Sequence, residues 1–316
     1  MKPKHMKTYP KVTIMIPTYN QEDYIGEAIE SSLNQDYPNL EVIVSDDFSK
    51  DKTGIIAKKY ETDTRFRYFR NARNLGRVGN YHHTLYDLAT GEWVINLDGD
   101  DFYTDNRYIS RLMKYVSSDP KIVCCHALHG FSQNIKDLAI KCIAKDTYIL
   151  DGVEYFKNLF HGAYFSHQGA LYKRELALKD GKCYTYSGIQ SDFHGVIRYS
   201  VLGHVVVTID DAYFWRIHGN NETFSQNNLA KYKSERLCQY LIIEDLPENS
   251  LTDYEKKQWL IYGKQSAKRQ YIIDCLCLSP SMASLSKGIC NYRFKWSYNV
   301  ILIKTMLRVM GFNIKI

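Results

Sequence analysis

The sequence predicts an α/β protein with a mostly parallel sheet that helices cover on both faces. Short apolar runs rich in β-branched residues alternate along the chain with helical stretches of roughly 10–15 residues. Several of these runs end directly in carboxylates or other polar side chains. Ligands bind at the carboxyl ends of the strands in open α/β sheets, so the same pattern predicts a binding site there.

The expected elements follow from turn residues such as Gly76 and Gly91, which separate the apolar runs. Strands are expected within Val12–Asn20 and Leu40–Ser49, and at Arg65–Arg70, Trp93–Leu97 and Ala212–Ile217. Helices are expected at Glu22–Leu33, Lys52–Tyr60, Asn80–Ala89 and Val196–Val201, and from about Thr104.

The most informative feature is an acidic cluster, Asp98, Asp100 and Asp101, directly after the apolar run Trp93–Leu97. Two carboxylates ~4 Å apart repel by about 4 kcal/mol at an effective dielectric constant near 20. Such a cluster favours a cation, and oxygen ligands favour Mg²⁺ or Mn²⁺. The alternative is a polar turn whose aspartates cap the helix expected near Thr104.

Two further strand ends carry candidate binding residues. The first run ends in Pro17, Thr18 and Tyr19, and the second ends in Asp46 and Asp47. Neither the dinucleotide-binding G-x-G-x-x-G pattern nor the Walker pattern is present in the sequence. The alternatives are an ordinary turn after the first run and a helix cap after the second, although Ser49 and Asp51 lie nearer to that helix.

In this order, these motifs resemble the family 2 inverting glycosyltransferases with the GT-A fold. The resemblance covers about residues 11–225. It rests on Ile16–Asn20, Val44–Ser49, Asn74-x-Gly76, Thr90–Glu92, Leu97–Asp101, Gln168–Tyr172 and Trp215–Asn221. It implies a mixed, mostly parallel GT-A sheet over residues 1–225, followed by a basic, mainly helical extension over 226–316.

The resemblance also implies roles for individual residues. It implies that the nucleotide-sugar donor is bound by Pro17, Thr18, Tyr19, Asp46, Asp47, Asn74, Gly76, Asp98, Gly99 and Arg216. Within this set Asp46 would accept the imide N–H of uracil, which makes a UDP-sugar the expected donor. The metal ligands would be Asp98, Asp100 and His218, with Mg²⁺ or Mn²⁺ as cofactor.

The catalytic base is expected at Asp192, which matches the carboxylate of the family's Glu-Asp pair, while Ser191 replaces the preceding glutamate. Each of these assignments has a structural alternative. Ser191 or Asp192 could cap the following helix, Arg216 could form an internal ion pair, and His218 could be a buried structural histidine. Tyr81, His82, His83, His161, Tyr164 and His167 are left as contacts without an assigned role.

Composition and charge limit the remaining possibilities. The 316 residues include no apolar stretch long enough to span a membrane, no secretory signal and no C-x-x-C pair, so we expect a cytoplasmic enzyme with reduced cysteines. The segment from Leu260 to the end contains nine basic residues and one acidic residue, whereas the whole chain has a net charge of +6. This tail has no recognisable nucleic-acid module. We expect it to hold the protein on the anionic inner face of the cell membrane, through an amphipathic helix at Trp296–Met310; the alternative is that this helix packs on protein.

The expected function is therefore a metal-dependent inverting transfer of a sugar to a glycan or lipid-linked glycan acceptor. A non-catalytic nucleotide-sugar-binding protein on the same fold is the alternative, and Ser191 is the feature that favours it. A sugar-phosphate nucleotidyltransferase would need a glycine-rich loop near the N-terminus, which Ile16–Asn20 is not. The sequence carries no prediction of the oligomeric state.

Overall fold

The computed structural model describes residues 9–128, 133–161, 165–188, 190–218 and 228–277. The chain divides into one compact unit at residues 1–267 and a second at residues 268–316. The description that follows concerns the first unit.

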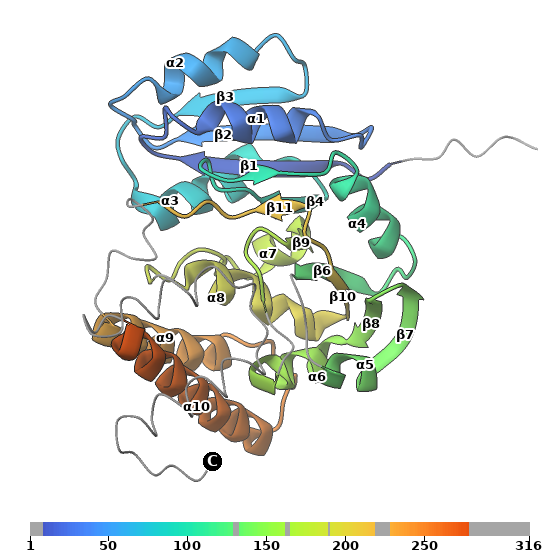
Figure 1. Ribbon diagram of the computed structural model, residues 1–316. Coiled ribbons are helices and arrows are strands. Elements are labelled where there is room, and N and C mark those ends of the chain that lie inside the picture. The colour runs from blue at the N-terminus through green and yellow to red at the C-terminus, as the bar shows by residue number, and fades with distance from the viewer. Residues whose placement is uncertain (1–8, 129–132, 162–164, 189, 219–227, 278–316) are drawn as a thin grey trace, which may run out of the picture. The chain divides into compact units, whose positions relative to one another are not determined.

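A nine-stranded mixed sheet forms the centre of this unit, with strand order β3-β2-β1-β4-β9-β6-β10-β8-β7 (Figure 1). Its strands are β1 (Val12–Thr18), β2 (Leu40–Asp46), β3 (Phe66–Arg70), β4 (Trp93–Asn96), β6 (Ile122–Leu128), β7 (Ala139–Ala144), β8 (Thr147–Asp151), β9 (Ala170–Lys173) and β10 (His204–Ile209). The pairs β1–β2, β1–β4, β2–β3 and β6–β10 are parallel. Strand β9 is antiparallel to both β4 and β6, and β8 is antiparallel to both β10 and β7. The predicted fold class is confirmed.

The helices lie close to the predicted positions in the N-terminal half. The α-helices are α1 (Ile25–Leu33), α2 (Thr53–Ala57), α3 (Gly76–His83), α4 (Tyr108–Val116), α5 (Gln133–Asp137), α6 (Gly152–Lys157), α7 (Arg174–Lys179), α8 (Ser191–Ile197), α9 (Asn228–Glu244) and α10 (Asp253–Cys277). Short 3₁₀ or π turns follow α2, α3, α6 and α8, at η1 (Lys58–Tyr60), η2 (Thr84–Leu88), η3 (Leu159–His161) and η4 (Arg198–Leu202).

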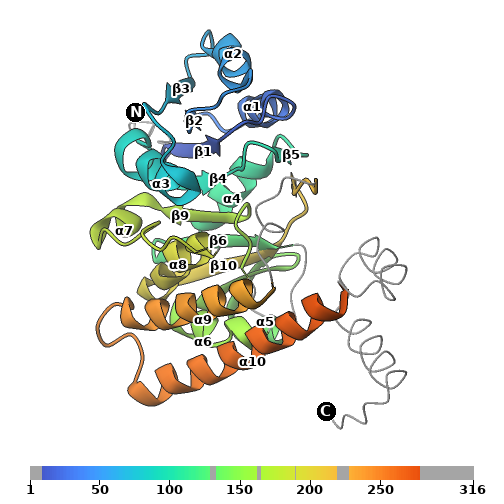
Figure 2. The ribbon, with the colours of Figure 1, turned by 90° about the vertical axis from the view of Figure 1, so that its left-hand side faces the viewer.

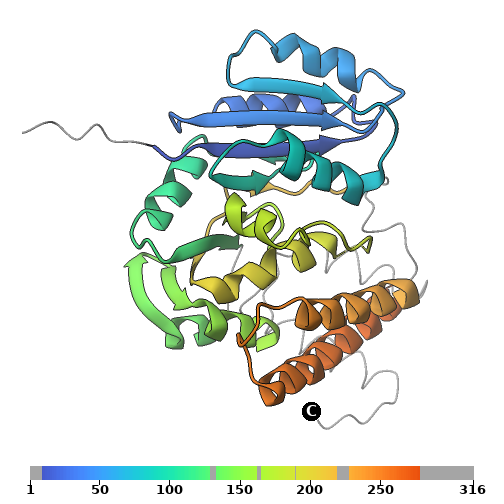
Figure 3. The same ribbon diagram turned by 180° about the vertical axis from the view of Figure 1, so that it is seen from behind.

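Hydrophobic cores lie on both faces of the sheet, because alternate side chains of each strand point to opposite faces. Ile14 and Ile16 of β1 belong to the core that includes Ile29 of α1, whereas Met15 belongs to the core that includes Tyr81 of α3. Helix α1 accordingly lies in front of the sheet in Figure 1, and α3 lies in front of it when the molecule is seen from behind in Figure 3. All seven residues of β1 are buried, which explains why this strand reads as a nearly continuous apolar run.

A second, two-stranded sheet corrects two predicted boundaries. Strand β5 (Phe102–Tyr103) pairs antiparallel with β11 (Tyr213–Phe214). Residues 102–103 therefore form a strand before α4, which begins at Tyr108 rather than near Thr104, and the strand predicted at Ala212–Ile217 is only two residues long. At the start of α4 the backbone N–H of Ile109 donates to Oε1 of Gln35 at 3.1 Å and that of Arg107 donates to Asp105 at 2.8 Å, so the acidic cluster does not have the capping role that was its alternative.

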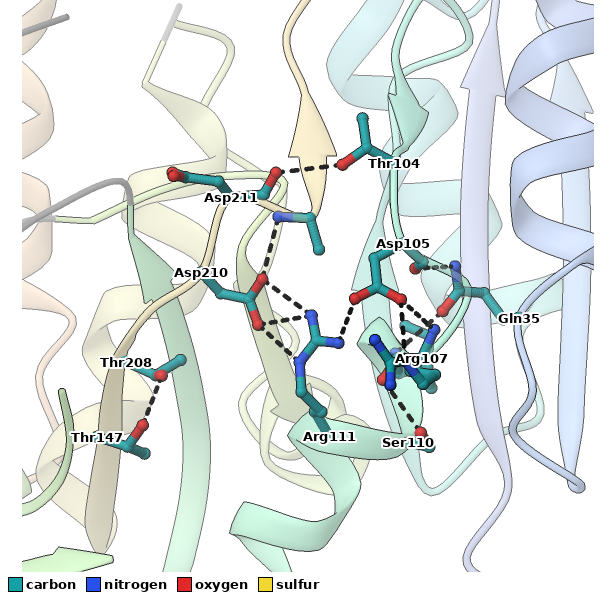
Figure 4. A network of polar contacts seen from close by, with 12 residues as sticks. Gln35, Thr104, Asp105, Arg107, Ser110, Arg111, Thr147, Thr208, Asp210 and Asp211 are labelled. Atoms are coloured by element: carbon teal, nitrogen blue, oxygen red, sulfur yellow. Dashed lines mark hydrogen bonds and ion pairs between the residues drawn. The ribbon is translucent and has the colours of Figure 1, made fainter. Parts of the chain in front are cut away.

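An ion-pair network holds this small sheet in place, as Figure 4 shows. Arg111 of α4 donates to both carboxylate oxygens of Asp210 at 2.9–3.1 Å and to Asp105 at 2.6 Å. The backbone N–H of Ala212 also donates to Asp210, at 3.0 Å. The network thus fixes the chain just before β11 against the helix that follows β5.

Helix α9 and the part of α10 up to Ala267 belong to the same compact unit as the sheet. They run side by side in Figure 2. The side-chain amide of Gln239 in α9 donates to the backbone carbonyl of Gly263 in α10 at 3.2 Å. Trp259 of α10 is buried and stacks on Phe156 of α6 at 4.9 Å between ring centroids. The boundary predicted at residue 225 stays a prediction.

The described residues do not reach the amphipathic segment Trp296–Met310. In the portion of the chain that is described, no helix has the length and apolarity needed to cross a bilayer.

Candidate active site

The acidic loop after β4 gathers its three aspartates into one cluster. Single carboxylate oxygens of Asp98, Asp100 and Asp101 lie within 4.8 Å of one another. The backbone N–H of Asp101 donates to the carbonyl of Asp98 at 2.9 Å, which closes a tight turn. A Cβ at Gly99 would lie 2.7 Å from Oγ1 of Thr18, so only glycine allows the loop to approach the end of β1 this closely.

The electrostatics of the cluster suit a divalent cation. Burial and the negative charge of Asp98 raise the pKa of both Asp100 and Asp101 above the ordinary range for aspartate. These oxygens are the kind of ligands that Mg²⁺ and Mn²⁺ prefer. The predicted ligand His218 lies beside them, with its Nε2 2.8 Å from Oδ2 of Asp100. The donor set therefore fits the predicted metal.

Arg216 braces the acidic loop from the other side. Its Nε donates to the carbonyl of Asp100 at 2.9 Å, and its backbone N–H donates to Oδ1 of Asp101 at 2.8 Å. Its guanidinium also pairs with Glu27 and lies over the ring of Tyr24, 5.0 Å from the ring centroid. These contacts match the internal ion pair that was the alternative to phosphate binding, so the donor contact of Arg216 stays a prediction.

The end of β2 holds Asp46 in a tightly bonded position. Oδ2 of Asp46 accepts a hydrogen bond from the hydroxyl of Tyr68 at 2.7 Å, and Oδ1 accepts one from the backbone N–H of Ser49 at 2.8 Å. The alternative role for this strand end was to cap α2. Asp51 has that role instead, because its carboxylate accepts a hydrogen bond from the backbone N–H of Thr53 at 3.0 Å. The structure therefore leaves the uracil contact of Asp46 as a prediction.

Asp47 ties the same strand end to the loop before α3. Its Oδ1 accepts from the backbone N–H of Leu75 at 2.7 Å and from Nδ2 of Asn71 at 2.9 Å. Asn74 donates to the carbonyl of Asp47 at 3.1 Å and accepts from the N–H of Gly76 at 2.9 Å. Gly76 has φ +76°, a conformation that glycine adopts at little cost.

The first strand completes this edge of the sheet. Thr18 pairs in register with Asp46 of β2, and Pro17 pairs with Ser45. Tyr19 follows with its side chain 47% exposed, available to a ligand. Strands β3, β2, β1 and β4 are consecutive in the sheet and parallel, so their carboxyl ends and the loops that follow them place all the predicted donor residues except Arg216 along one edge of the sheet.

Asp192 lies in the first turn of α8. Gln190, the residue before the helix, makes no capping hydrogen bond through its side chain, whereas the carboxylate of Asp192 accepts a hydrogen bond from the backbone N–H of Phe193. One carboxylate oxygen of Asp192 lies 3.2 Å from Nδ1 of His167. Burial would raise the pKa of Asp192, yet the charges of His167 and Arg77 outweigh it and lower that pKa. Asp192 is therefore ionised, as a base must be. Ser191 is buried beside it.

Sequence reasoning left His167 without a role and did not single out the side chain of Gln168. His167 Nε2 lies 3.6 Å from Oδ1 of Asp98, so one imidazole stands between Asp98 and Asp192. Despite burial, these two carboxylates raise the pKa of His167 to about 10. Gln168 donates to Oδ2 of Asp101 at 2.8 Å. Both residues lie just before β9, and no pattern in the sequence indicates that this antiparallel strand starts where β4 ends.

The comparison with solved structures shows which class of protein the fold defines. Crystallised TarS 1–349 of Staphylococcus aureus, in complex with UDP-GlcNAc, superimposes with a TM-score of 0.62 at 19% identity, over 85% of this chain and 76% of that one. The mannosyltransferase PcManGT of Pyrobaculum calidifontis, in complex with GDP-Man and Mn²⁺, gives a TM-score of 0.56 at 18% identity, over 90% of this chain and 81% of that one. The chain thus has the fold of GT-A glycosyltransferases.

The family follows from sequence. The family model "Glycosyl transferase family 2" matches residues 13–179, more than half of the chain, and the chain belongs to that family. A GalNAc(5)-diNAcBac-PP-undecaprenol beta-1,3-glucosyltransferase of Campylobacter jejuni is 34% identical over 160 residues, 50% of this chain and 51% of that protein. The putative glycosyltransferase EpsE of Bacillus subtilis is 39% identical over 98 residues, 30% of this chain and 35% of that protein. The matches thus span about half, or less, of the length of these relatives.

Proposed function

We propose that this chain is a metal-dependent inverting glycosyltransferase that moves a sugar from a UDP-sugar to a hydroxyl of a glycan or lipid-linked glycan during synthesis of a cell-surface polysaccharide. The observation that carries the proposal is the convergence of the acidic cluster with the ionised Asp192, one imidazole away. TarS in complex with UDP-GlcNAc supports a UDP-sugar as donor, and the name of the Campylobacter relative supports a lipid-linked acceptor.

The proposed chemistry divides between the two sides of the site. Asp98, Asp100 and His218 would hold Mg²⁺ or Mn²⁺, which when bound stabilises the negative charge on a departing nucleoside diphosphate. On the other side, a carboxylate oxygen of Asp192 takes the proton from the acceptor hydroxyl as that oxygen attacks the anomeric carbon. A single displacement of this kind inverts the configuration at that carbon.

A survey of UDP-sugars tests the proposal. The full chain is incubated with UDP-GlcNAc, UDP-Glc or UDP-Gal and an undecaprenyl-diphosphate-linked glycan, with Mn²⁺ or with excess chelator, and released UDP is measured. We expect metal-dependent release of UDP and a product with inverted anomeric configuration. A product with retained configuration would contradict the single displacement.

The same survey separates the alternative function. A nucleotide-sugar-binding protein without catalysis would bind UDP in calorimetry and release none from any donor. The position of Asp192 argues against this alternative, since a carboxylate one imidazole away from the acidic cluster lies where it can take the proton of an acceptor hydroxyl.

We further propose that the basic tail holds the enzyme at the inner face of the cell membrane, beside its lipid-linked acceptor. Each basic residue near an anionic surface contributes about 1 kcal/mol to such binding. Sedimentation with phosphatidylglycerol-containing vesicles tests this: the intact chain should bind, salt should weaken binding, and deletion of residues 290–316 should abolish it. If the intact chain stays in the supernatant and the deletion unfolds the protein, the tail packs on protein instead.

A further inference from the structure

We propose that His167 is a positioning residue that holds the carboxylate of Asp192 at a fixed separation from Asp98. The inference rests on the proposed function, because it gives Asp192 the role of base and Asp98 a place on the donor side. It goes beyond that function because it names the side chain that sets the geometry between the two sides of the site.

The imidazole of His167 spans the two carboxylates with its two ring nitrogens. Nδ1 lies 3.2 Å from Oδ2 of Asp192, and Nε2 lies 3.6 Å from Oδ1 of Asp98. The His167 side chain is 12% exposed, so it stands within the site rather than on the surface. The separation of the two carboxylates is therefore set by the width of a single ring.

Tyr81 locks the orientation of this ring. Its hydroxyl lies 3.0 Å from Nε2 of His167 and also bonds Oδ1 of Asp98. The two rings meet edge to face with centroids 5.4 Å apart, and Tyr81 stacks in turn on Tyr184 at 5.0 Å. A packed aromatic wall thus prevents the imidazole from rotating away from the carboxylates.

The backbone delivers His167 to this place because of the sheet topology. Strand β9 is antiparallel to β4, so the residues that precede β9 lie where β4 ends and the acidic loop begins. A Cβ at Gly169 would lie 2.0 Å from the carbonyl oxygen of Ala127, and the N–H of Ala127 donates to the carbonyl of Gly169 at 2.8 Å. This close seating on β6 fixes the segment that carries His167.

Two amide variants separate the two contacts of the ring. The side-chain amide of Asn can replace Nδ1, which faces Asp192, whereas that of Gln can replace Nε2, which faces Asp98. We expect His167→Gln to lower kcat by about 10²-fold, the cost of roughly 1 Å of misplacement, with the KM for the UDP-sugar unchanged within twofold. His167→Asn, which keeps the contact with Asp192 and loses only the contact with Asp98, should lower kcat less than His167→Gln does.

His204→Gln is the matched control. His204 also pairs with an aspartate, Asp119 at 2.6 Å, but it begins β10 at the opposite end of the sheet and should leave kcat unchanged. Equal kcat for wild type and both His167 variants would overturn the proposal. A raised KM for the UDP-sugar with unchanged kcat would also overturn it, since His167 would then bind the donor.

A crystallographic readout is independent of turnover. In crystals of His167→Gln, with UDP and Mn²⁺ added, the Asp192 side chain should leave the orientation it has in the wild type, and in His167→Asn it should keep it. An unmoved Asp192 in His167→Gln refutes the positioning role. If the wild-type chain transfers no sugar, the proposed function fails, and the crystals still decide whether His167 positions Asp192.

Discussion

Glu41 gives the most quantitative prediction. This buried carboxylate lies far from the active site and joins three neighbouring strands. Its oxygens accept hydrogen bonds from Thr13 of β1 at 2.6 Å and from the backbone N–H of Thr90 at 3.0 Å. They also pair with Lys11 at 3.0 Å and with Arg67 of β3 at 3.1 Å. Glu41 lies at the amino end of β2, opposite the end that carries Asp46.

The magnitude follows from the protonation of this carboxylate. Burial alone would raise the pKa of Glu41, but the bonds from Thr13, Thr90 and Lys11 outweigh it and lower the pKa from 4.5 to about 2. A pKa difference of that size between the folded and the unfolded chain contributes about 3 kcal/mol to the free energy of unfolding. Because the folded pKa is the lower one, this contribution is present above pH 4.5 and is lost as the pH falls from about 4.5 to about 2.

Denaturant unfolding of the wild type and Glu41→Gln from pH 7 to pH 3 measures this contribution. At pH 7 the variant should be less stable by about 3 kcal/mol, and the difference should shrink steadily below pH 4.5. Glu61→Gln, at an exposed glutamate of the same unit, is the control and should match the wild type throughout. Equal stability of Glu41→Gln and wild type at pH 7, or a difference that does not change with pH, would refute the reasoning. Sugar transfer at 25 °C should be unaffected.

Three further predictions concern the site. Asp100→Asn should abolish metal-dependent transfer while circular dichroism stays native, and chelator should do the same to the wild type; full turnover in excess chelator would exclude the metal. Asp192→Asn should lower kcat, measured by steady-state kinetics, by roughly 10²–10⁴-fold. Its affinity for UDP, measured by calorimetry, should be nearly unchanged. A loss of UDP binding with intact chemistry would contradict the role of Asp192 as base. Asp46→Asn should weaken UDP binding in calorimetry, whereas Tyr68→Phe, which removes only the hydroxyl bonded to Asp46, should weaken it much less; equal effects would assign Asp46 to the strand end rather than to the nucleotide.

The central strands of the N-terminal half could be predicted because they are fully buried. Strands β1, β2 and β4 are buried along their whole length, so their apolar runs are visible without any knowledge of their neighbours. Strand β5 could not be predicted in the same way. Its two residues form a strand only because Tyr213 and Phe214, more than a hundred positions later, lie opposite them.

The residues of the site show the same difference between features that the local sequence predicts and features that depend on distant parts of the chain. The carboxylates could be named from the resemblance, since each stands in a short motif beside a predicted strand or helix. The position of His167 between Asp98 and Asp192 could not, because it depends on β9 running antiparallel to β4, and a sequence motif carries no information on strand direction. The same holds for Arg216, whose contact with Glu27 joins residues that are far apart in the sequence.

The short pairing of β5 with β11 allows the site to open locally at a lower free energy than global unfolding requires. Only two residues from each strand join this small sheet, yet it carries the acidic loop on one side and the segment with Arg216 and His218 on the other. A local opening would separate His218 from Asp100 if it broke this pairing, the Arg111–Asp210 contact and the bonds of Arg216 to the acidic loop and Glu27, while the nine-stranded sheet kept its amide protons protected from exchange. Loss of catalysis on warming can therefore precede loss of the fold, and an assay of secondary structure would not detect it.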